Sequence, residues 1–257
     1  MSDDIRQPAV AGAFYPADAL ELRRQVEGFL AAVEQDGEAA APIAIIAPHA
    51  GYVYSGPVAA SAYATVDASR VRRVVLFGPA HRVAFSGVGA SSARCWRTPL
   101  GDVPVAAPTG IPAVDIAHQQ EHSLEVQLPF MQVVLEQFTL IPLVVGDIHP
   151  ASLAPAMEQL WGDDDTLVVV SADLSHFESY ARARAIDNNT SEAIINLDDN
   201  SISHHDSCGC VPIRALLQVA RKKGLRPRLL DLRNSGDTAG DRRRVVGYGA
   251  YAFYYDQ

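Results

Sequence analysis

The feature that most constrains the fold is a set of three short aliphatic runs, each followed closely by a loop that carries a histidine. The runs cover residues 43–47, 73–77 and 166–170, and the histidines after them are His49, His81 and His176. Short continuous apolar runs are typical of strands buried on both faces of a sheet. We therefore expect three buried strands whose ends bring polar side chains to one edge of that sheet.

Helical segments separate these runs. The first helix is indicated by Asp18 as its N-cap, by Glu21 three residues later, and by an apolar stripe that includes Leu22 and Val26. Further helices are expected over residues 56–66, 123–138, 152–160, 180–197 and 211–223, and further strands over residues 140–145, 228–232 and 245–254. This alternation predicts an α/β fold with one mixed, mostly parallel sheet flanked by helices and a last strand that runs antiparallel. No repeat or long linker divides the sequence, so we expect a single domain over residues 1–257.

Composition and charge exclude several functions. The 30 acidic residues exceed the 21 basic ones, and the resulting net charge of -9 would repel a polyanion, so no nucleic-acid partner is expected. No segment reaches the roughly 18 uninterrupted apolar residues of a membrane span, so no membrane is expected either. Three cysteines are too few and of the wrong parity for a disulfide framework, and the first residues lack a secretory pattern. Both features favour a cytoplasmic location.

The histidines at the strand ends indicate a metal site. Neutral imidazole is the commonest metal ligand, and catalytic sites use three protein ligands while leaving a position open. His49 and His81 supply two such ligands. From the residues alone the third ligand stays open among Asp173, Glu125, His122, His176, Cys208 and Cys210.

Two of these candidates have local features of their own. Cys208 lies just before the helix expected at residue 211, where the helix-end potential is expected to lower the pKa of a thiol. His122 and Glu125 are three residues apart, so on a helix they would share one face and could form a polar pocket wall. Glu121 and Ser123, which flank His122, are interpreted as helix caps.

Seven blocks of sequence, in order, resemble the Memo family. They lie at residues 6–16, 47–60, 78–83, 97–103, 121–130 and 171–177 and around Cys208. The family is similar to type III extradiol ring-cleaving dioxygenases, which implies a LigB-like α/β fold and a mononuclear non-haem iron site. In bacteria its members accompany a radical-SAM protein and a small AMMECR-like protein, so the resemblance implies those partners as well.

The resemblance also implies roles for particular residues. His49, His81 and Cys208 match the family's metal ligands, while Asp173 and His176 match further polar residues of its pocket and are the expected catalytic residues. The dioxygenases use two histidines and a carboxylate, whereas a thiolate stands in here. Because thiolate also suits copper and zinc, the expected cofactor is Fe²⁺ with those two metals as alternatives.

Three functions follow from this set of residues. The leading hypothesis is a metal-dependent redox enzyme that acts on a small-molecule substrate, with His176 moving protons. The second is a binding or adaptor module that uses the same pocket without turnover. The third is a zinc hydrolase, which would need Glu125 or Asp173 as a general base beside the metal.

Overall fold

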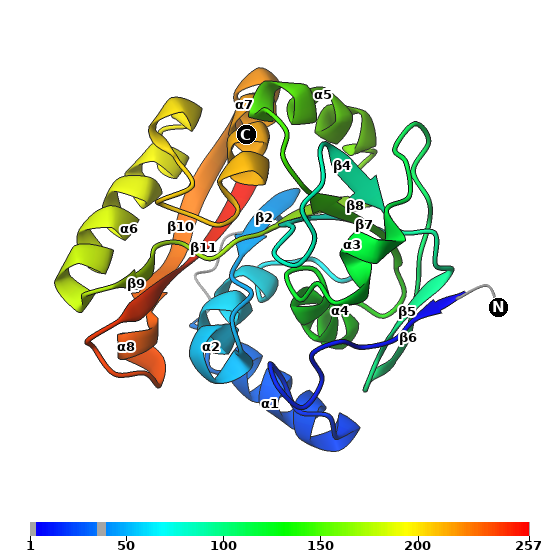
Figure 1. Ribbon diagram of the computed structural model, residues 1–257, viewed down its shortest axis with the longest axis horizontal. Helices are drawn as coiled ribbons and strands as arrows, with labels where there is room; N and C mark the ends of the chain where they lie inside the picture. The colour runs from blue at the N-terminus through cyan, green and yellow to red at the C-terminus, as the bar shows by residue number, and fades with distance from the viewer. Residues whose placement is uncertain (1–3, 35–39, 257) are drawn as a thin grey trace.

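A mixed sheet forms the centre of the computed structural model, which describes residues 4–34 and 40–256 (Figure 1). Its strand order is β10-β11-β2-β8-β3-β7-β4, and β9 pairs with β11 beside this path. The strands are β2 (Ala44–Ala47), β3 (Arg73–Pro79), β4 (Val88–Ala90), β7 (Thr139–Val145), β8 (Thr166–Ser171), β9 (His176–Glu178), β10 (Leu225–Asn234) and β11 (Val245–Tyr255). The expected architecture, a mixed α/β sheet flanked by helices, is confirmed.

The middle of the sheet is parallel and its edges are antiparallel. Strands β2, β8, β3 and β7 run parallel to one another, whereas β4, β10 and β11 pair antiparallel with their neighbours. Every residue of β2 and β8 is buried, as continuous aliphatic runs covered on both faces require. The last strand, β11, is antiparallel to β2 and β10, as expected.

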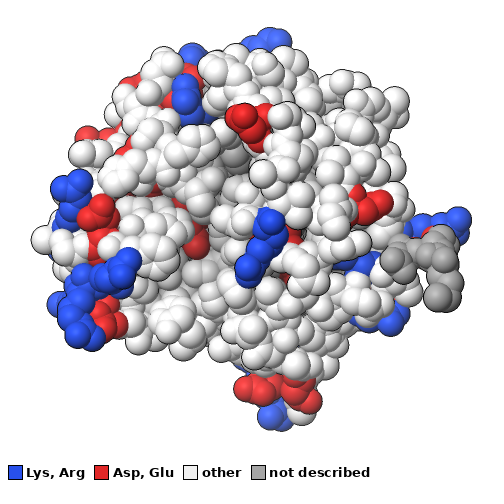
Figure 2. All heavy atoms as spheres, viewed as in Figure 1, with Lys and Arg blue, Asp and Glu red and all other residues white. Residues whose placement is uncertain are grey.

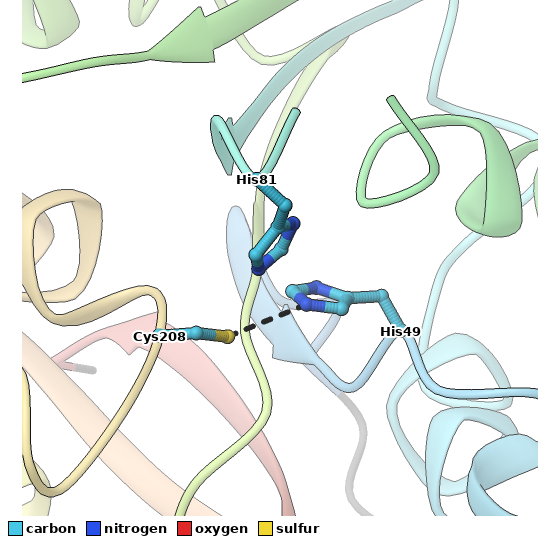
Figure 3. Close-up of side chains that lie close together, drawn as sticks. All are labelled: His49, His81 and Cys208. Carbon is cyan, nitrogen blue, oxygen red and sulfur yellow. Dashed lines mark hydrogen bonds between the residues drawn. The ribbon is translucent and has the colours of Figure 1, made fainter. Parts of the chain in front are cut away.

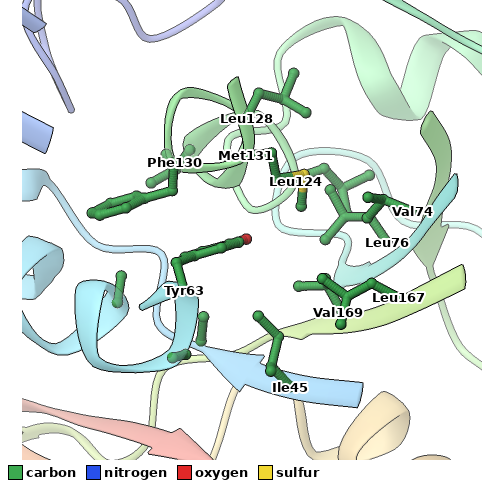
Figure 4. Packing of buried hydrophobic residues seen from close by; sticks show 14 of the residues in the cluster. Ile45, Tyr63, Val74, Leu76, Leu124, Leu128, Phe130, Met131, Leu167 and Val169 are labelled. Carbon is green, nitrogen blue, oxygen red and sulfur yellow. The ribbon is translucent and has the colours of Figure 1, made fainter. Parts of the chain in front are cut away.

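Helices cover both faces of the sheet. On one face lie α1 (Ala19–Ala31), α2 (Tyr52–Tyr63) and α4 (Leu128–Val134), whose side chains enter one apolar core (Figure 4). On the other face α5 (Pro150–Leu160), α6 (Tyr180–Ile195) and α7 (Cys210–Lys223) contribute to a second core. The short elements are α3 (Asp115–Gln119), α8 (Ser235–Thr238) and the 3-10 turns η1 (Glu125–Gln127) and η2 (Asp199–Ser201).

Local start and stop signals act as the sequence indicates. The Asp18 carboxylate accepts a hydrogen bond from the Glu21 amide at 2.9 Å, which caps α1. Helix α7 ends at Gly224, whose φ of 67° lies in the left-handed region that glycine adopts without strain. In contrast, α2 begins at Tyr52, earlier than the expected residue 56.

The helix expected over residues 123–138 is confirmed only in part. The segment forms the turn η1 and then the short helix α4, which ends at Val134. The carboxylate of Glu125, in this turn, points toward the N-terminal segment and pairs with Arg6. A small second sheet of β1 (Ile5–Arg6), β5 (Cys95–Thr98) and β6 (Gly101–Pro104) was not expected either.

Charged side chains are unevenly distributed over the surface. On the face drawn in Figure 2, basic side chains gather mainly at the edge over β9 and α8, and acidic side chains lie among them. Most of the rest of this face carries no charge. Within the described residues, no helix combines the length and the apolar character needed to cross a membrane.

Candidate metal centre

Three neighbouring parallel strands bring the candidate residues to one edge of the sheet. His49, His81 and Asp173 each follow the end of their strand, β2, β3 or β8, by two residues. Because β2, β8 and β3 are adjacent and parallel, their carboxyl ends meet at the same edge. The strand-end argument made from the sequence therefore places these three side chains correctly in the fold.

The fourth residue, Cys208, comes from the loop before α7. This loop packs closely against the residue that follows β8. A Cβ atom added at Gly209 would lie only 2.4 Å from the Cβ of Ala172. Only glycine permits so close an approach without a shift of the backbone. The Ser207 hydroxyl donates to the Asp173 carbonyl at 2.6 Å and holds the loop in place.

His49, His81 and Cys208 form a compact cluster. Their potential ligand atoms all lie within 4.8 Å of one another, and Figure 3 shows the three side chains directed toward a common point. The His49 side chain is 2% exposed and that of His81 is 28% exposed. The cluster therefore has a buried floor at His49 and a side open to solvent at His81.

The hydrogen bonds around His49 fix its tautomer. The Ser171 hydroxyl has one proton, which it donates to the Ser123 carbonyl at 2.6 Å. At 2.9 Å from His49 Nδ1 this hydroxyl must therefore act as acceptor, so Nδ1 carries the proton. The unprotonated Nε2 atom then faces the Cys208 sulfur at 3.3 Å. Burial, followed by the charge of His81, lowers the pKa of His49 to about 3, so the ring is neutral at pH 7.

His81 is oriented by a buried carboxylate. Its Nδ1 atom lies 2.9 Å from a carboxylate oxygen of Glu121, which can only accept, so Nδ1–H is the donor. Although burial opposes its ionisation, hydrogen bonds from His81 and from nearby amides lower the pKa of Glu121 to about 2. The Nε2 atom of His81 is left free, in the carboxylate–histidine arrangement found at many metal sites.

The thiol of Cys208 does not behave as the sequence suggested. Burial, and secondly the negative charge of Asp173, raise the pKa of Cys208 well above its usual value. The expectation that the helix end would lower this pKa is wrong, because α7 begins only at Cys210 and desolvation dominates. A cation must therefore displace the thiol proton, as is usual when metal binding and thiol ionisation are coupled.

Asp173 lies directly beside this cluster. One of its carboxylate oxygens accepts a hydrogen bond from the His49 amide at 2.7 Å, and the other lies 4.0 Å from His49 Nε2. Burial raises the pKa of Asp173, while the bond from the His49 amide opposes that rise. The carboxylate thus fixes the His49 loop and keeps one oxygen directed toward the candidate metal position.

His122 packs against the cluster, whereas His176 lies at the exposed start of β9. The His122 ring stacks on that of His81, with 4.7 Å between their centroids, and its centroid is 5.5 Å from that of His49. His176 is exposed at the start of β9, and its Nδ1–H donates to the Leu174 carbonyl at 2.8 Å. Its Nε2 atom is consequently free to accept a proton, and its charge influences the buried His49.

Glu125 is placed elsewhere. Its carboxylate pairs with Arg6 and accepts hydrogen bonds from the Ala9 amide at 2.8 Å, the Val10 amide at 3.0 Å and the Tyr15 hydroxyl at 2.5 Å. These contacts saturate the carboxylate and direct it toward the N-terminal segment. The structure therefore places His122 at the cluster, whereas Glu125 binds the N-terminal segment and does not face the cluster.

Two supporting residues were missed from the sequence. Glu121 was interpreted as a cap, and Ser171 had no assigned role, although each fixes the tautomer of one histidine. Gln127 adds a third contact, since its side-chain amide donates to the Ser171 hydroxyl at 2.8 Å. Their positions in the sequence could have indicated these roles. Glu121 directly precedes His122, and Ser171 ends the strand that leads to Asp173.

The donor set fits a single transition-metal ion. Two imidazoles whose Nδ1 atoms are held in hydrogen bonds turn their Nε2 atoms to the cluster, and one thiol lies beside them. This set suits zinc, copper or iron. Three protein ligands leave coordination positions for a small molecule. The second possible group, His81 with Glu121 and His122, shares His81 with the first and is already used in hydrogen bonds.

The fold and site together define a class: α/β proteins with a candidate mononuclear centre at the carboxyl ends of parallel strands. Within it, this chain belongs to the Memo family, because the family model described as Memo-like protein matches residues 6–252. The resemblance noted in the sequence is thereby confirmed.

Similar proteins of archaea extend this match over nearly the whole chain. A MEMO1 family protein of Methanosarcina mazei is 36% identical over 272 residues, which cover 96% of this chain and 98% of that protein. Its counterpart in Metallosphaera sedula is 35% identical and covers 96% of this chain and 99% of that protein. A third MEMO1 family protein, from Methanopyrus kandleri, is 36% identical with coverage of 96% and 98%.

Proposed function

We propose that this protein holds one redox-active transition metal between His49, His81 and Cys208 and acts on a small organic substrate. The observation that carries the proposal is the fixed tautomer of both histidines. Each ring donates through Nδ1 to an acceptor of its own, Ser171 or Glu121, and therefore keeps Nε2 free. A pair of histidines that served only the fold would need no such common orientation.

Iron is the metal that we propose first, with copper and zinc as alternatives. Ferrous iron would supply one-electron chemistry and positions for oxygen and substrate beside three protein ligands. The thiolate of Cys208 replaces the carboxylate of the dioxygenase arrangement and donates more charge. This difference also makes the site sensitive to air, since a thiolate is itself oxidisable.

Proton transfer is assigned to His176. Its Nδ1–H is held by the Leu174 carbonyl, so the free Nε2 atom can take up a proton from substrate and return it. Asp173 supports the chemistry by fixing the His49 loop through the amide of that residue. His122 contributes a polar wall between the two histidine ligands.

The zinc hydrolase alternative keeps only part of its support. Glu125, one of the two general bases that it requires, is saturated by Arg6 and two backbone amides. Asp173 remains as a base next to the metal position. The adaptor alternative uses the same pocket and differs by the absence of turnover.

The test is metal occupancy followed by access to the metal. Protein purified without chelator, and iron-reconstituted without oxygen, should hold one metal ion and show a thiolate charge-transfer band. His49→Ala, His81→Ala and Cys208→Ala should each lose most of the metal and keep the fold. The exposed His205 and the distant Cys95 provide matched controls, His205→Ala and Cys95→Ala.

Nitric oxide then distinguishes an open redox centre from the alternatives. The ferrous protein should bind nitric oxide, detected by electron paramagnetic resonance, because three ligands leave positions free. Protein that takes up no iron, or whose iron is closed to nitric oxide, would favour the zinc or adaptor reading. Full occupancy in all three ligand variants would exclude this centre altogether.

A further inference from the structure

A cavity of about 300 Å³ opens beside the candidate metal centre. His81 and Cys208, two of the three proposed ligands, form part of its wall. The rest of the wall comes from the end of β3, the loop after it, the end of β7 and the first turn of α7. A molecule in this cavity would therefore lie directly against the metal position.

The wall is predominantly apolar. Its apolar or uncharged small residues are Pro79, Ala80, Val83, Ala84, Phe85, Val145, Gly146, Val211 and Pro212. Apart from the two ligands, the polar side chains of this wall are those of Asp147 and His204. Such a surface favours an apolar occupant, because burial of apolar groups is the main source of affinity in small cavities.

Backbone hydrogen bonds hold the cavity in shape. The Gly146 amide donates to the Gly87 carbonyl at 2.9 Å, and the Asp147 amide donates to the Phe85 carbonyl at 2.8 Å. A Cβ at Gly146 would be 2.2 Å from the Phe85 carbonyl oxygen, so the loop and β7 are in close contact. The cavity is consequently formed before any ligand enters, which lowers the entropic cost of binding.

The negative charge of Asp147, at the solvent-exposed end of the cavity, adds a second basis for ligand selectivity. Asp147 is exposed, and no described residue forms an ion pair with its carboxylate. An anionic ligand would meet this negative charge, whereas a neutral or cationic group would not. A nucleotide is disfavoured by its negative charge, and the volume of about 300 Å³ lies at the small end of the range for small-molecule sites.

We propose that the cavity binds the apolar end of a small, single-ring or short branched molecule whose other end reaches the metal, and that this molecule is uncharged or cationic. The inference rests on the proposed metal centre and adds the substrate class. Asp147 is the specificity-determining residue at the solvent-exposed end of the cavity. Ala84 lies in the cavity wall, where a larger side chain would occupy the ligand volume.

The experiment uses cobalt(II)-substituted protein, whose absorption bands report both thiolate ligation and binding of a further ligand. Imidazole and 4-phenylimidazole are titrated as probes, because they share the coordinating nitrogen and differ by one apolar ring. Burial of that ring should tighten binding by about tenfold or more. Equal affinity for the two probes would overturn the cavity assignment.

Variants separate the cavity from the metal. Ala84→Phe should abolish the advantage of 4-phenylimidazole while leaving the cobalt stoichiometry and the thiolate–cobalt bands unchanged. Ala181→Phe, at an exposed position of α6, serves as the matched control. Val83→Phe fills the same wall and repeats the test should Ala84→Phe fail to fold. Preserved preference for the phenyl probe in both variants would refute the proposal.

A charged probe tests the outer end. The carboxylate probe 4-(imidazol-4-yl)benzoate should bind more weakly than 4-phenylimidazole, and Asp147→Asn should narrow that difference. An anionic probe that binds more tightly would contradict the charge assignment. Absence of thiolate–cobalt bands would instead refute the metal centre itself, so failure of the proposed function and failure of the cavity remain distinguishable.

Discussion

The sulfur atom of Cys208 lies 3.3 Å from Nε2 of His49, although 159 positions separate the two residues in the chain. The contact joins the end of a buried parallel strand to the loop that precedes α7. Ser171 fixes the proton of His49 on Nδ1, so Nε2 carries a lone pair. The thiol of Cys208 therefore donates a hydrogen bond to Nε2. A cation that replaces the thiol proton would turn this hydrogen bond into two metal–ligand bonds.

Replacement of Glu121 by glutamine should weaken metal binding without removing a ligand. The buried carboxylate keeps the proton of His81 on Nδ1, and an amide can present an N–H group there instead. We expect the dissociation constant for zinc to rise by about 10- to 100-fold, with one site still filled at saturation. Competition with a chromophoric chelator measures this change, with Glu178→Gln as control. An unchanged constant would show that Glu121 does not orient the ligand.

Cys208→Asp should change which metals bind. A carboxylate restores the two-histidine, one-carboxylate set, so the variant should retain iron after anaerobic reconstitution. It should lose the thiolate charge-transfer band and bind copper(I) and zinc more weakly, because these metals prefer sulfur. Absorption spectra and metal analysis check both outcomes, with Cys95→Asp as control. A band that persists in Cys208→Asp would identify another thiol, such as Cys210, as the ligand.

Glu125→Gln should affect stability rather than metal binding. The variant breaks a fully buried pair with Arg6, which typically reduces the free energy of unfolding by about 3–5 kcal/mol. The exposed pair of Arg97 and Asp102 offers a control, since Asp102→Asn should cost at most about 1 kcal/mol. Urea unfolding measures both changes. If the Glu125→Gln variant were as stable as the unmodified protein but had lost its metal, Glu125 would instead have to be assigned to the metal site.

Stability should fall in mild acid, and His118 should account for part of the loss. Burial lowers the pKa of His118 to about 4, although its hydrogen bond to the Gly89 carbonyl opposes the shift. Between pH 6.5 and 4 the unfolded chain therefore binds a proton that the folded protein excludes, so stability decreases as pH falls.

His118→Gln removes that contribution. In chelator-treated protein, the dependence of the unfolding free energy on pH should become shallower by up to about 1.4 kcal/mol per pH unit in this range. The exposed His205→Gln variant should leave the dependence unchanged. Equal slopes for His118→Gln and the unmodified protein would contradict the assignment. His49 and His122, whose pKa values burial also lowers, contribute in the same direction and remain present in both.

Much of the central sheet could be predicted because its strands are continuous aliphatic runs. The rule that ligands gather at the carboxyl ends of such strands also located His49, His81 and Asp173. Cys208 lies in a loop that the same rule does not reach, and only the family resemblance singled it out among the candidate third ligands. Its place beside His49 depends on the close packing of Gly209 on Ala172.

The supporting residues could not be predicted from local pattern. Glu121 contacts His81 across 40 positions, and nothing in the intervening segment signals that contact. Glu125 was paired with His122 on the assumption of one helix. The segment instead forms a 3-10 turn at Glu125, and the Glu125 carboxylate pairs with Arg6 of the N-terminal segment. The short strands of the second sheet were missed because β5 and β6 alternate only over four residues each.

The position of β11 bears on how the centre responds to damage at the chain's later strands. This strand follows β10 in the sequence, yet it lies inside the sheet between β10 and β2, and β2 leads directly to His49. Removal of residues 245–255 by proteolysis would take away one neighbour of β2 and leave a row of its backbone groups unpaired. Such a clipped protein would display an open, aggregation-prone strand edge beside the strand that carries the first proposed ligand.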